Sequence, residues 1–246
     1  MSLVFSDTTN KSGIIQQLER KCGFNDGDIS GNPLRMAQFT ADINLAMDNV
    51  SAKIFKLGGT WQFDDSNHTG YPIITTDLVA GQRDYSFVAD SEGNLILGIY
   101  KVMVLENGKY KDITPVDQQS QTEDVRTLTN GEDTTGSVTR YDKTANGIFL
   151  DLVPEADVTD GLKMYINRES TYFTVSDTTK KPGFDGLVHE YIVLDVAYKY
   201  ARDKRLANRV DLKEGLAMEE IKLNNRYGKR QRDISRDLKP YHQDNR

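Results

Sequence analysis

The spacing of apolar residues changes twice along this 246-residue chain, and the change limits the folds it can adopt. Between residues 33 and 57, apolar side chains recur every three or four positions, which is the period of one face of an α-helix. Between residues 60 and 182, short apolar runs alternate with clusters of turn residues, as in β-structure. After residue 183 the helical period returns. The chain is therefore expected to be α+β.

The first helical segment predicts one short and one long helix. Apolar residues before Gly23 indicate the short helix. Asn32 is a suitable N-cap for the long helix, Pro33 suits its first position, and Gly58-Gly59 ends it. The face of the long helix that is expected to be buried comprises Phe39, Ile43, Met47, Val50, Ile54 and Leu57.

The second helical segment begins with a stretch that is apolar nearly all round, from residue 187 to 206. Because such a helix is buried on most sides, we expect it to be central and to pack on the helix at 33–57. A further helix is expected to follow and to lead into a basic tail. Its residues that are expected to point inward are Leu212, Leu216, Ile221 and Leu223.

The middle segment predicts several short strands separated by turns. Asn107-Gly108, between two strand-like runs, is a strong hairpin signal. Other turn signals are Ala80-Gly81, Asn130-Gly131, Asn146-Gly147 and Asp160-Gly161. The strands expected between the turns cover residues 71–79, 83–88, 95–105, 109–114, 137–142, 147–152 and 162–175. This pattern predicts an antiparallel β-sandwich or barrel, and the polar residues 118–136 predict an exposed loop.

Together the segments predict a helical bundle domain that is split in sequence, with an antiparallel β-sandwich or barrel domain inserted into it. The helical domain is expected to comprise residues 1–59 and 183–246, and the inserted β-domain residues 60–182. Because the two ends of an inserted domain must lie close together, Gly58-Gly59 and Pro182-Gly183 are expected to act as hinges.

Composition restricts the class of protein. The net charge of −6 argues against general nucleic-acid binding, which normally requires an excess of cations. The single cysteine, Cys22, excludes an intrachain disulfide and fits a reducing cytoplasm. No apolar run approaches the roughly 20 residues that a membrane span needs, and the first residues lack the apolar centre of a signal peptide. We expect a soluble protein that is made in a cytoplasm and has no membrane partner.

Few residues suggest catalysis. The three histidines are far apart in sequence, and no glycine-rich nucleotide loop or nucleophile-elbow motif is present. Asp64, Asp65 and Asp151 are candidates for a metal hydrolase, but carboxylates in polar turns are more commonly solvated surface. We therefore expect no enzyme and no cofactor, and the metal hydrolase stays an alternative.

Aromatic residues at the start of the β segment admit two interpretations. Trp61, Phe63 and Tyr71 could pack where the two domains join. Trp61 and Tyr71 could instead contact a ligand such as a sugar. The second interpretation would make the β-domain a binding module.

The C-terminal segment is basic although the whole chain is acidic. Residues 222–246 contain eight cationic and three acidic side chains, so their net charge is about +5. The segment is either a solvated end or an arm that docks on an acidic partner. The residues assigned to a docking arm are Arg226, Lys229, Arg230, Arg232, Arg236, Lys239 and Tyr241.

Several of these segments, in this order, resemble the head-to-tail adaptor proteins of short-tailed bacteriophages. Asp77–Phe87 is similar to a segment of that family in which a Gly-Gln pair precedes a tyrosine and an apolar residue. Leu97–Val104 and Thr114–Asp117 are similar to the hairpin that follows there, and Lys181–Ala201 to the return to a late helix. The resemblance covers residues 30–235 and rests on the order of short motifs.

The resemblance implies a structural virion protein at the head–tail junction, assembled in the host cytoplasm. Such adaptors form a homo-oligomeric ring, usually a dodecamer, beneath the portal protein, and genome DNA passes through it without specific binding. Helices pack between copies, the C-terminal arm reaches the portal, and the β-domain faces the tail nozzle or tail fibre proteins. Residues 118–136 have no counterpart. The alternative is a β-sandwich binding module of a phage tail protein, for tail fibre or glycan attachment.

Overall fold

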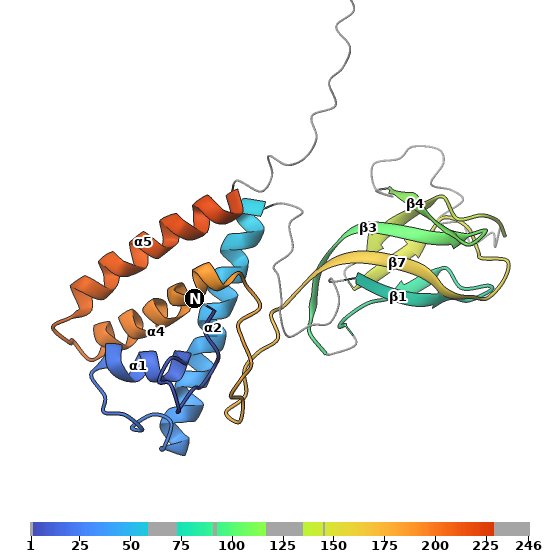
Figure 1. The fold of residues 1–246 in the computed structure, drawn as a ribbon. Coiled ribbons are helices and arrows are strands. Elements are labelled where there is room, and N and C mark those ends of the chain that lie inside the picture. The colour runs from blue at the N-terminus through green and yellow to red at the C-terminus, as the bar shows by residue number, and fades with distance from the viewer. Residues whose placement is uncertain (1, 59–72, 91–92, 117–134, 145, 229–246) are drawn as a thin grey trace, which may run out of the picture. The chain divides into compact units, whose positions relative to one another are not determined.

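The computed structural model is an α+β protein of two compact units (Figure 1). The helical unit draws its residues from 1–67 and 172–246, and the β unit from 68–171. Each unit has its own hydrophobic core, so neither depends on the other for its interior. The residues that the structure describes are 2–58, 73–90, 93–116, 135–144 and 146–228.

One helix is central to the helical unit. Helix α4 contacts α1, α2 and α5, which are the other three α-helices among the described residues. This confirms the prediction that the apolar stretch after residue 187 forms a central helix that packs on the long helix. The elements of the unit are α1 (Ile14–Cys22), α2 (Pro33–Gly58), the 3₁₀-helix η1 (Gly186–Val188), α4 (His189–Asp203) and α5 (Arg209–Gly228).

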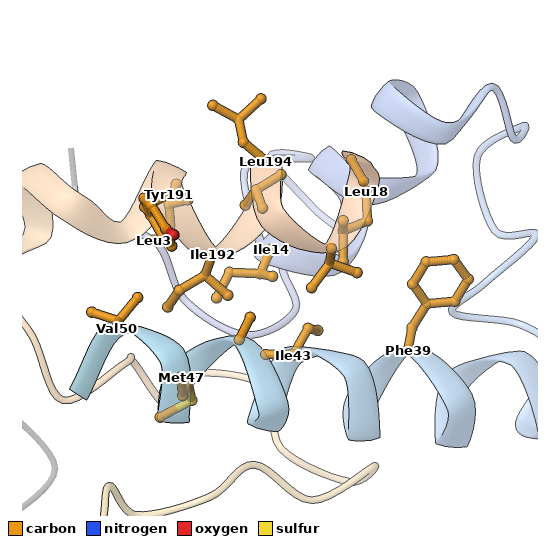
Figure 2. Close-up of a cluster of buried hydrophobic side chains, with 14 of the residues drawn as sticks. Leu3, Ile14, Leu18, Phe39, Ile43, Met47, Val50, Tyr191, Ile192 and Leu194 are labelled. Atoms are coloured by element: carbon orange, nitrogen blue, oxygen red, sulfur yellow. The ribbon is translucent and has the colours of Figure 1, made fainter. Parts of the chain in front are cut away.

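The core of the helical unit lies between α2 and α4 (Figure 2). Ile43, Met47 and Val50 of α2 face this core, and Ile192 of α4 lies across from them; all four are fully buried. Full burial of a side chain of this size stabilises the fold by roughly 1.5–3 kcal/mol relative to exposure. The predicted face of the long helix is therefore the face that forms the core.

Local sequence sets the ends of the first two helices. Asn32 caps α2, because its Oδ1 accepts hydrogen bonds from the amides of Leu34 and Arg35, both at 3.1 Å. Helix α1 ends at Gly23, whose φ of 78° lies in the left-handed region that glycine adopts readily. Both ends agree with the sequence prediction.

Residues 172–182 lie in the helical unit, whereas the sequence placed them in the β-domain. The amide of Phe5 donates a hydrogen bond to the carbonyl of Lys180 at 2.7 Å. The rings of Phe5 and Phe173 stack with their centroids 4.6 Å apart. The prediction of a strand over 162–175 is therefore wrong at its C-terminal end, because these residues pack against the N-terminal segment.

The β unit is a single curled sheet that has the form of half a barrel. Neighbouring strands are antiparallel except for β4 and β5, which pair in parallel. The order across the sheet is β1 (Ile73–Leu78), β7 (Val158–Arg168), β3 (Ile96–Glu106), β4 (Lys109–Pro115), β5 (Arg140–Thr144), β6 (Gly147–Leu150) and β2 (Asp84–Ser86). The described residues thus form a partial barrel and not a two-sheet sandwich. The sequence predicts a wholly antiparallel sheet, and the parallel pair of β4 and β5 contradicts that prediction.

The strongest turn signal forms the predicted hairpin. Asn107 and Gly108 connect β3 to β4 with positive φ values of 50° and 73°. Glu106 pairs with Lys109 on either side of them, which is the register of a two-residue hairpin. Positive φ at both central positions is the reason that Asn-Gly predicts this turn so well.

The Asp160-Gly161 pair is not a turn, in contrast to the sequence prediction. It lies inside β7, where the pairing with β1 shifts register and forms a bulge. The amide of Asp160 donates to the carboxylate of Asp77 at 2.8 Å. A Cβ atom on Gly161 would lie 2.8 Å from the Leu78 side chain and 2.7 Å from the carbonyl oxygen of Val158, so the bulge requires glycine.

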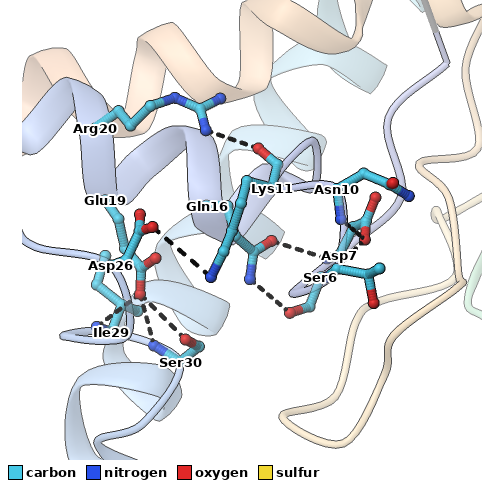
Figure 3. A network of polar contacts seen from close by, with 11 residues as sticks. Ser6, Asp7, Asn10, Lys11, Gln16, Glu19, Arg20, Asp26, Ile29 and Ser30 are labelled. Carbon is cyan, nitrogen blue, oxygen red and sulfur yellow. Dashed lines mark hydrogen bonds and ion pairs between the residues drawn. The ribbon is translucent and has the colours of Figure 1, made fainter.

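A buried carboxylate holds the connection between α1 and α2 (Figure 3). Glu19 Oε1 accepts hydrogen bonds from the amides of Ile29 and Ser30, both at 3.0 Å, and from the Ser30 hydroxyl at 3.2 Å. On the same helix, Gln16 accepts a hydrogen bond from the amide of Asp7 at 2.8 Å. Side chains of α1 therefore fix the irregular segments on both sides of that helix.

Replacement of Glu19 by alanine is expected to lower the free energy of unfolding by about 2–4 kcal/mol, because two backbone amides lose a buried acceptor. Urea denaturation followed by circular dichroism measures the change. Glu214→Ala, at an exposed position of α5, is the control and should change the free energy by less than about 0.5 kcal/mol. Equal losses in the two variants would show that Glu19 does not hold the loop.

Candidate functional site: a groove along the last helix

Two neighbouring cavities lie between α5 and the elements α1, η1 and α4. Their volumes are about 370 and 570 Å³. Glu190 of α4 and Glu219 of α5 line both cavities, so the two adjoin, and together we call them the α5 groove. Arg226, the first residue assigned to the docking arm, lines one end.

Apolar side chains that point to solvent lie beside this groove. Leu187 and Met218 line it, and each is 62% exposed. Val210 and Ile221, on the outward side of α5, are 56% and 54% exposed. The outward side of α5 therefore presents apolar side chains that no described residue covers.

The sequence predicts that Leu187 belongs to the central helix and that Ile221 points inward, and both predictions are wrong. Leu187 precedes α4 and lies in η1. The inward side of α5 is formed by Leu223 and Tyr227, which are buried, together with the buried Glu219. Ile221 therefore lies on the opposite side of the helix. The inward face of α5 thus contains the polar Glu219, whereas the apolar Ile221, which the pattern placed on that face, is exposed.

Ion pairs connect the elements around the α5 groove. Lys21 Nζ of α1 lies 3.4 Å from Glu190 Oε1 of α4. Arg226 Nε donates to Oδ2 of Asp185 at 2.7 Å, and its Nη2 lies 2.5 Å from the same oxygen. The groove therefore has cations and carboxylates along both walls, which suits contact with another polar surface.

Two buried oxygens beside the α5 groove accept no hydrogen bond from any described residue. Glu219 is 5% exposed; its Oε1 binds Lys222, but its Oε2 has no donor. Asn208 donates to the carbonyl of Lys21 at 2.9 Å, and its Oδ1 has no donor. Each buried acceptor without a donor costs about 1–3 kcal/mol. Because both atoms are shielded from solvent, they are unsatisfied groups inside the groove wall and not contact points for a partner.

His189 shapes one wall of the α5 groove by fixing the N-terminal segment to α4. Its Nδ1 accepts a hydrogen bond from the amide of Leu3 at 2.9 Å, and its Nε2 lies 2.9 Å from the carbonyl oxygen of Phe184. Leu3 in turn lines the groove. Burial lowers the pKa of His189 below its usual value, so the ring is neutral and donates from Nε2 to Phe184.

Of the residues assigned to the docking arm, the structure describes Arg226 alone. Tyr227, which follows it, is 1% exposed, belongs to the core, and accepts a hydrogen bond from the amide of Asp185 at 3.2 Å. Arg226 is thus part of the folded helix, and an arm can begin only after Gly228. The other assigned residues lie outside the described residues: Lys229, Arg230, Arg232, Arg236, Lys239 and Tyr241.

The carboxylates considered for a metal hydrolase include one described residue. Asp151 is 6% exposed and accepts hydrogen bonds from the amide and hydroxyl of Thr139 at 3.1 and 2.7 Å. Its contacts fix the backbone beside β5, which is a structural role. Asp64 and Asp65 lie outside the described residues. No three His, Cys, Asp or Glu side chains within the described ranges are placed to share a metal ion.

The sequence analysis also singled out three aromatic residues and the single cysteine. Trp61, Phe63 and Tyr71 lie outside the described residues, so neither interpretation of these aromatics is tested. Cys22 is buried in the helical core, and burial raises the pKa of its thiol to about 12. A thiol with this pKa is a poor nucleophile at neutral pH.

Comparison with known proteins provides no family for this chain. No protein-family model matches it, and no curated protein matches it. In the part of the chain that the structure describes, no helix combines the length and apolar character needed to cross a bilayer.

Acidification is expected to destabilise the protein through His189. The folded pKa of His189 is lowered, so below about pH 6.5 the unfolded chain binds more protons than the folded one, and the free energy of unfolding falls as pH falls. One such group contributes at most about 1.4 kcal/mol per pH unit. Urea denaturation between about pH 5.5 and 8 measures the slope. His189→Gln should reduce this slope, and an unchanged slope in His189→Gln would contradict this assignment.

Proposed function

We propose that the chain is a structural protein of a tailed-phage virion, which forms an adaptor ring that joins the portal to the tail and lets DNA pass. In this proposal a helical bundle split in sequence builds the ring, and an inserted β-domain faces the tail. The outward side of α5 carries the proposal, because its apolar side chains are exposed and lie beside a groove.

Helix α5 is apolar on two opposite sides. Leu212 and Leu223 point to the core of the helical unit. Val210, Ala217 and Ile221 lie on the other side and are exposed. At about 3.6 residues per turn, these three fall in one narrow stripe. A helix with apolar residues on both sides is typical of one that packs between its own domain and a neighbouring molecule, as between subunits of a ring.

The way in which the helical unit is built also supports the proposed ring. Residues from both ends of the chain build this unit. The outward side of α5 and the adjacent groove would close against the next copy, which would cover the exposed apolar side chains. A contact between two different surfaces repeats around an axis, which is the arrangement that closes into a ring.

The sequence beyond α5 supports contact with the portal. Residues 229–246 contain six cationic and three acidic side chains. They follow Gly228 directly, and Asn225 and Arg226 at that end of α5 line the groove. Arginine-rich segments bind carboxylate surfaces through charge-assisted hydrogen bonds. The arm is therefore proposed to dock on the portal, and the virion head–tail junction is the proposed location.

Ring formation on the portal is the direct test. The full chain, mixed with the portal protein of the same genome, is expected to give ring-shaped particles by negative-stain microscopy. Ile221→Lys should reduce ring yield by at least about tenfold, because it places a charge in an apolar contact, without a change in stability above about 0.5 kcal/mol. Thr75→Lys, which adds the same charge at an exposed position of the β unit, is the control. A wild-type chain that never associates with portal would overturn the proposal.

The arm is tested by a truncation after Gly228, which leaves the buried Tyr227 in place. The shortened chain is expected to keep the thermal unfolding midpoint of the full chain within a few degrees and to lose portal binding, as measured by co-sedimentation with portal. A shortened chain that binds portal as well as the full chain would remove the arm from the proposal.

A second candidate function, a binding module in the β unit, is favoured by one face of the sheet. Lys163 Nζ lies 4.7 Å from the ring centre of Tyr110, and Lys101 Nζ lies 5.9 Å from that of Tyr165. The two tyrosines are half-buried and sit opposite the face that forms the core. Such rows of aromatic and cationic side chains can bind sugars or fibre proteins.

The binding module predicts a phenotype that the ring does not. Tyr165→Ala is expected to abolish binding of the full chain to an immobilised tail fibre or to a glycan array, while portal association is retained. Ser86→Ala, at an exposed position of β2 on the opposite edge of the sheet, serves as the control. Unchanged binding in Tyr165→Ala would exclude this face as the ligand surface.

A further inference from the structure

Helix α2 also has an outward apolar stripe, separate from that of α5. Leu34 and Leu45 are 69% and 54% exposed, and Ala41 and Ala52 are exposed on the same side. At about 100° per residue, these four side chains fall within an arc of about 40° on the helix surface. The distance along the axis from Leu34 to Leu45 is about 16 Å. The buried face of α2 lies on the other side of the helix, so the core does not account for this stripe.

The stripe is complementary to itself when two copies of α2 run antiparallel. If Leu34 faces Leu45 of a second copy, then Gln38 faces Ala41 of that copy, and the reverse pairs follow by symmetry. At each end of the contact a leucine faces a leucine, and in the middle the small Ala41 faces the longer Gln38. Interdigitation of this kind is what close helix packing requires.

Charges on one flank of the stripe fit the same arrangement. Arg35 and Asp42 lie on the same side of the stripe, about 80–100° from its centre. In an antiparallel pair these flanks meet, and Arg35 of one copy comes within two residues, or about 3 Å along the axis, of Asp42 of the other. Two equivalent ion pairs would form. A parallel pair would bring this flank against the opposite one, so charge favours the antiparallel arrangement.

Asp42 is available for such a pair. Within the described ranges its carboxylate makes no hydrogen bond or ion pair. Partial burial raises the pKa of Asp42; the charge of Lys199 opposes this rise, and that of Asp203 adds to it. Arg35 donates through Nη1 to the carbonyl of Asp28 at 3.3 Å, and its guanidinium lies over the ring of Phe24, 5.0 Å from the ring centre. The guanidinium has further N–H donors that could bind a carboxylate of a second copy.

We propose that the outward stripe of α2 is a self-recognition surface, on which two copies of the free chain pair antiparallel about a twofold axis. The inference goes beyond the adaptor function, because a twofold contact closes on two copies and does not extend into a ring. A stripe on one helix is smaller than the interfaces of stable dimers, so the pair is expected to dissociate readily.

Sedimentation equilibrium of the full chain, from about 10 µM to 1 mM, tests the proposal. The wild-type chain is expected to dimerise within this range. Asp42→Arg and Arg35→Glu should each weaken self-association by at least about tenfold, because like charges then face each other. An equimolar mixture of the two variants should dimerise again, since each supplies the charge that the other lacks. Chains that stay monomeric over the whole range, or a mixture that does not dimerise, would overturn the proposal.

A second measurement keeps the proposal testable if Arg35→Glu destabilises the fold. Ala41→Cys places a thiol near the twofold axis, and a short bis-maleimide is expected to link it into a covalent dimer. Ala207→Cys, at an exposed position between α4 and α5, should not be linked, and the buried Cys22 does not react in either variant. Linkage of both variants to the same extent, or of neither, would overturn the proposal. The free chain is used throughout, so the result does not depend on ring formation with the portal.

Discussion

Burial of α4 is the interaction on which the helical unit depends. This helix contacts α1, α2 and α5, and its apolar side chains are covered on most sides. The other three helices need only one apolar face each, because each packs against the same central helix. Their opposite faces are thereby left at the surface. The buried central helix and the two exposed stripes on its neighbours are thus consequences of one arrangement.

Polar side chains fix the irregular segments around that core. His189 binds the amide of Leu3, and Glu19 binds the amides of Ile29 and Ser30. These groups are buried, so their hydrogen bonds determine a single path for segments that have no regular structure of their own. The α5 groove depends on them, because the segment that His189 holds forms part of its wall.

The outward surfaces of α2 and α5 are the features that most invite a functional interpretation. Each has large apolar side chains on the side away from the core, and α5 also borders a groove in which two acceptor oxygens have no donor among the described residues. Contact with further copies of the chain or with a partner would cover the exposed apolar side chains. This is the reason for which an assembly function is proposed.

The sequence by itself determined the elements whose stability is local. The buried face of α2, its Asn32 cap and the Asn107-Gly108 hairpin depend on residues a few positions apart, so periodicity and turn chemistry predicted them. Tertiary structure decided the rest. Residues 172–182 were assigned to the β-domain but lie in the helical unit, where they pair with the N-terminal segment. Asp160-Gly161 reads as a turn but forms a bulge against β1, and Ile221 reads as core but is exposed. The charge of Arg226 marked it as a candidate docking residue in the sequence. The groove beside it could not be predicted, because its walls come from α1, η1, α4 and α5. Contacts between residues far apart in sequence leave no periodic trace in any one segment, so only the folded chain reveals them.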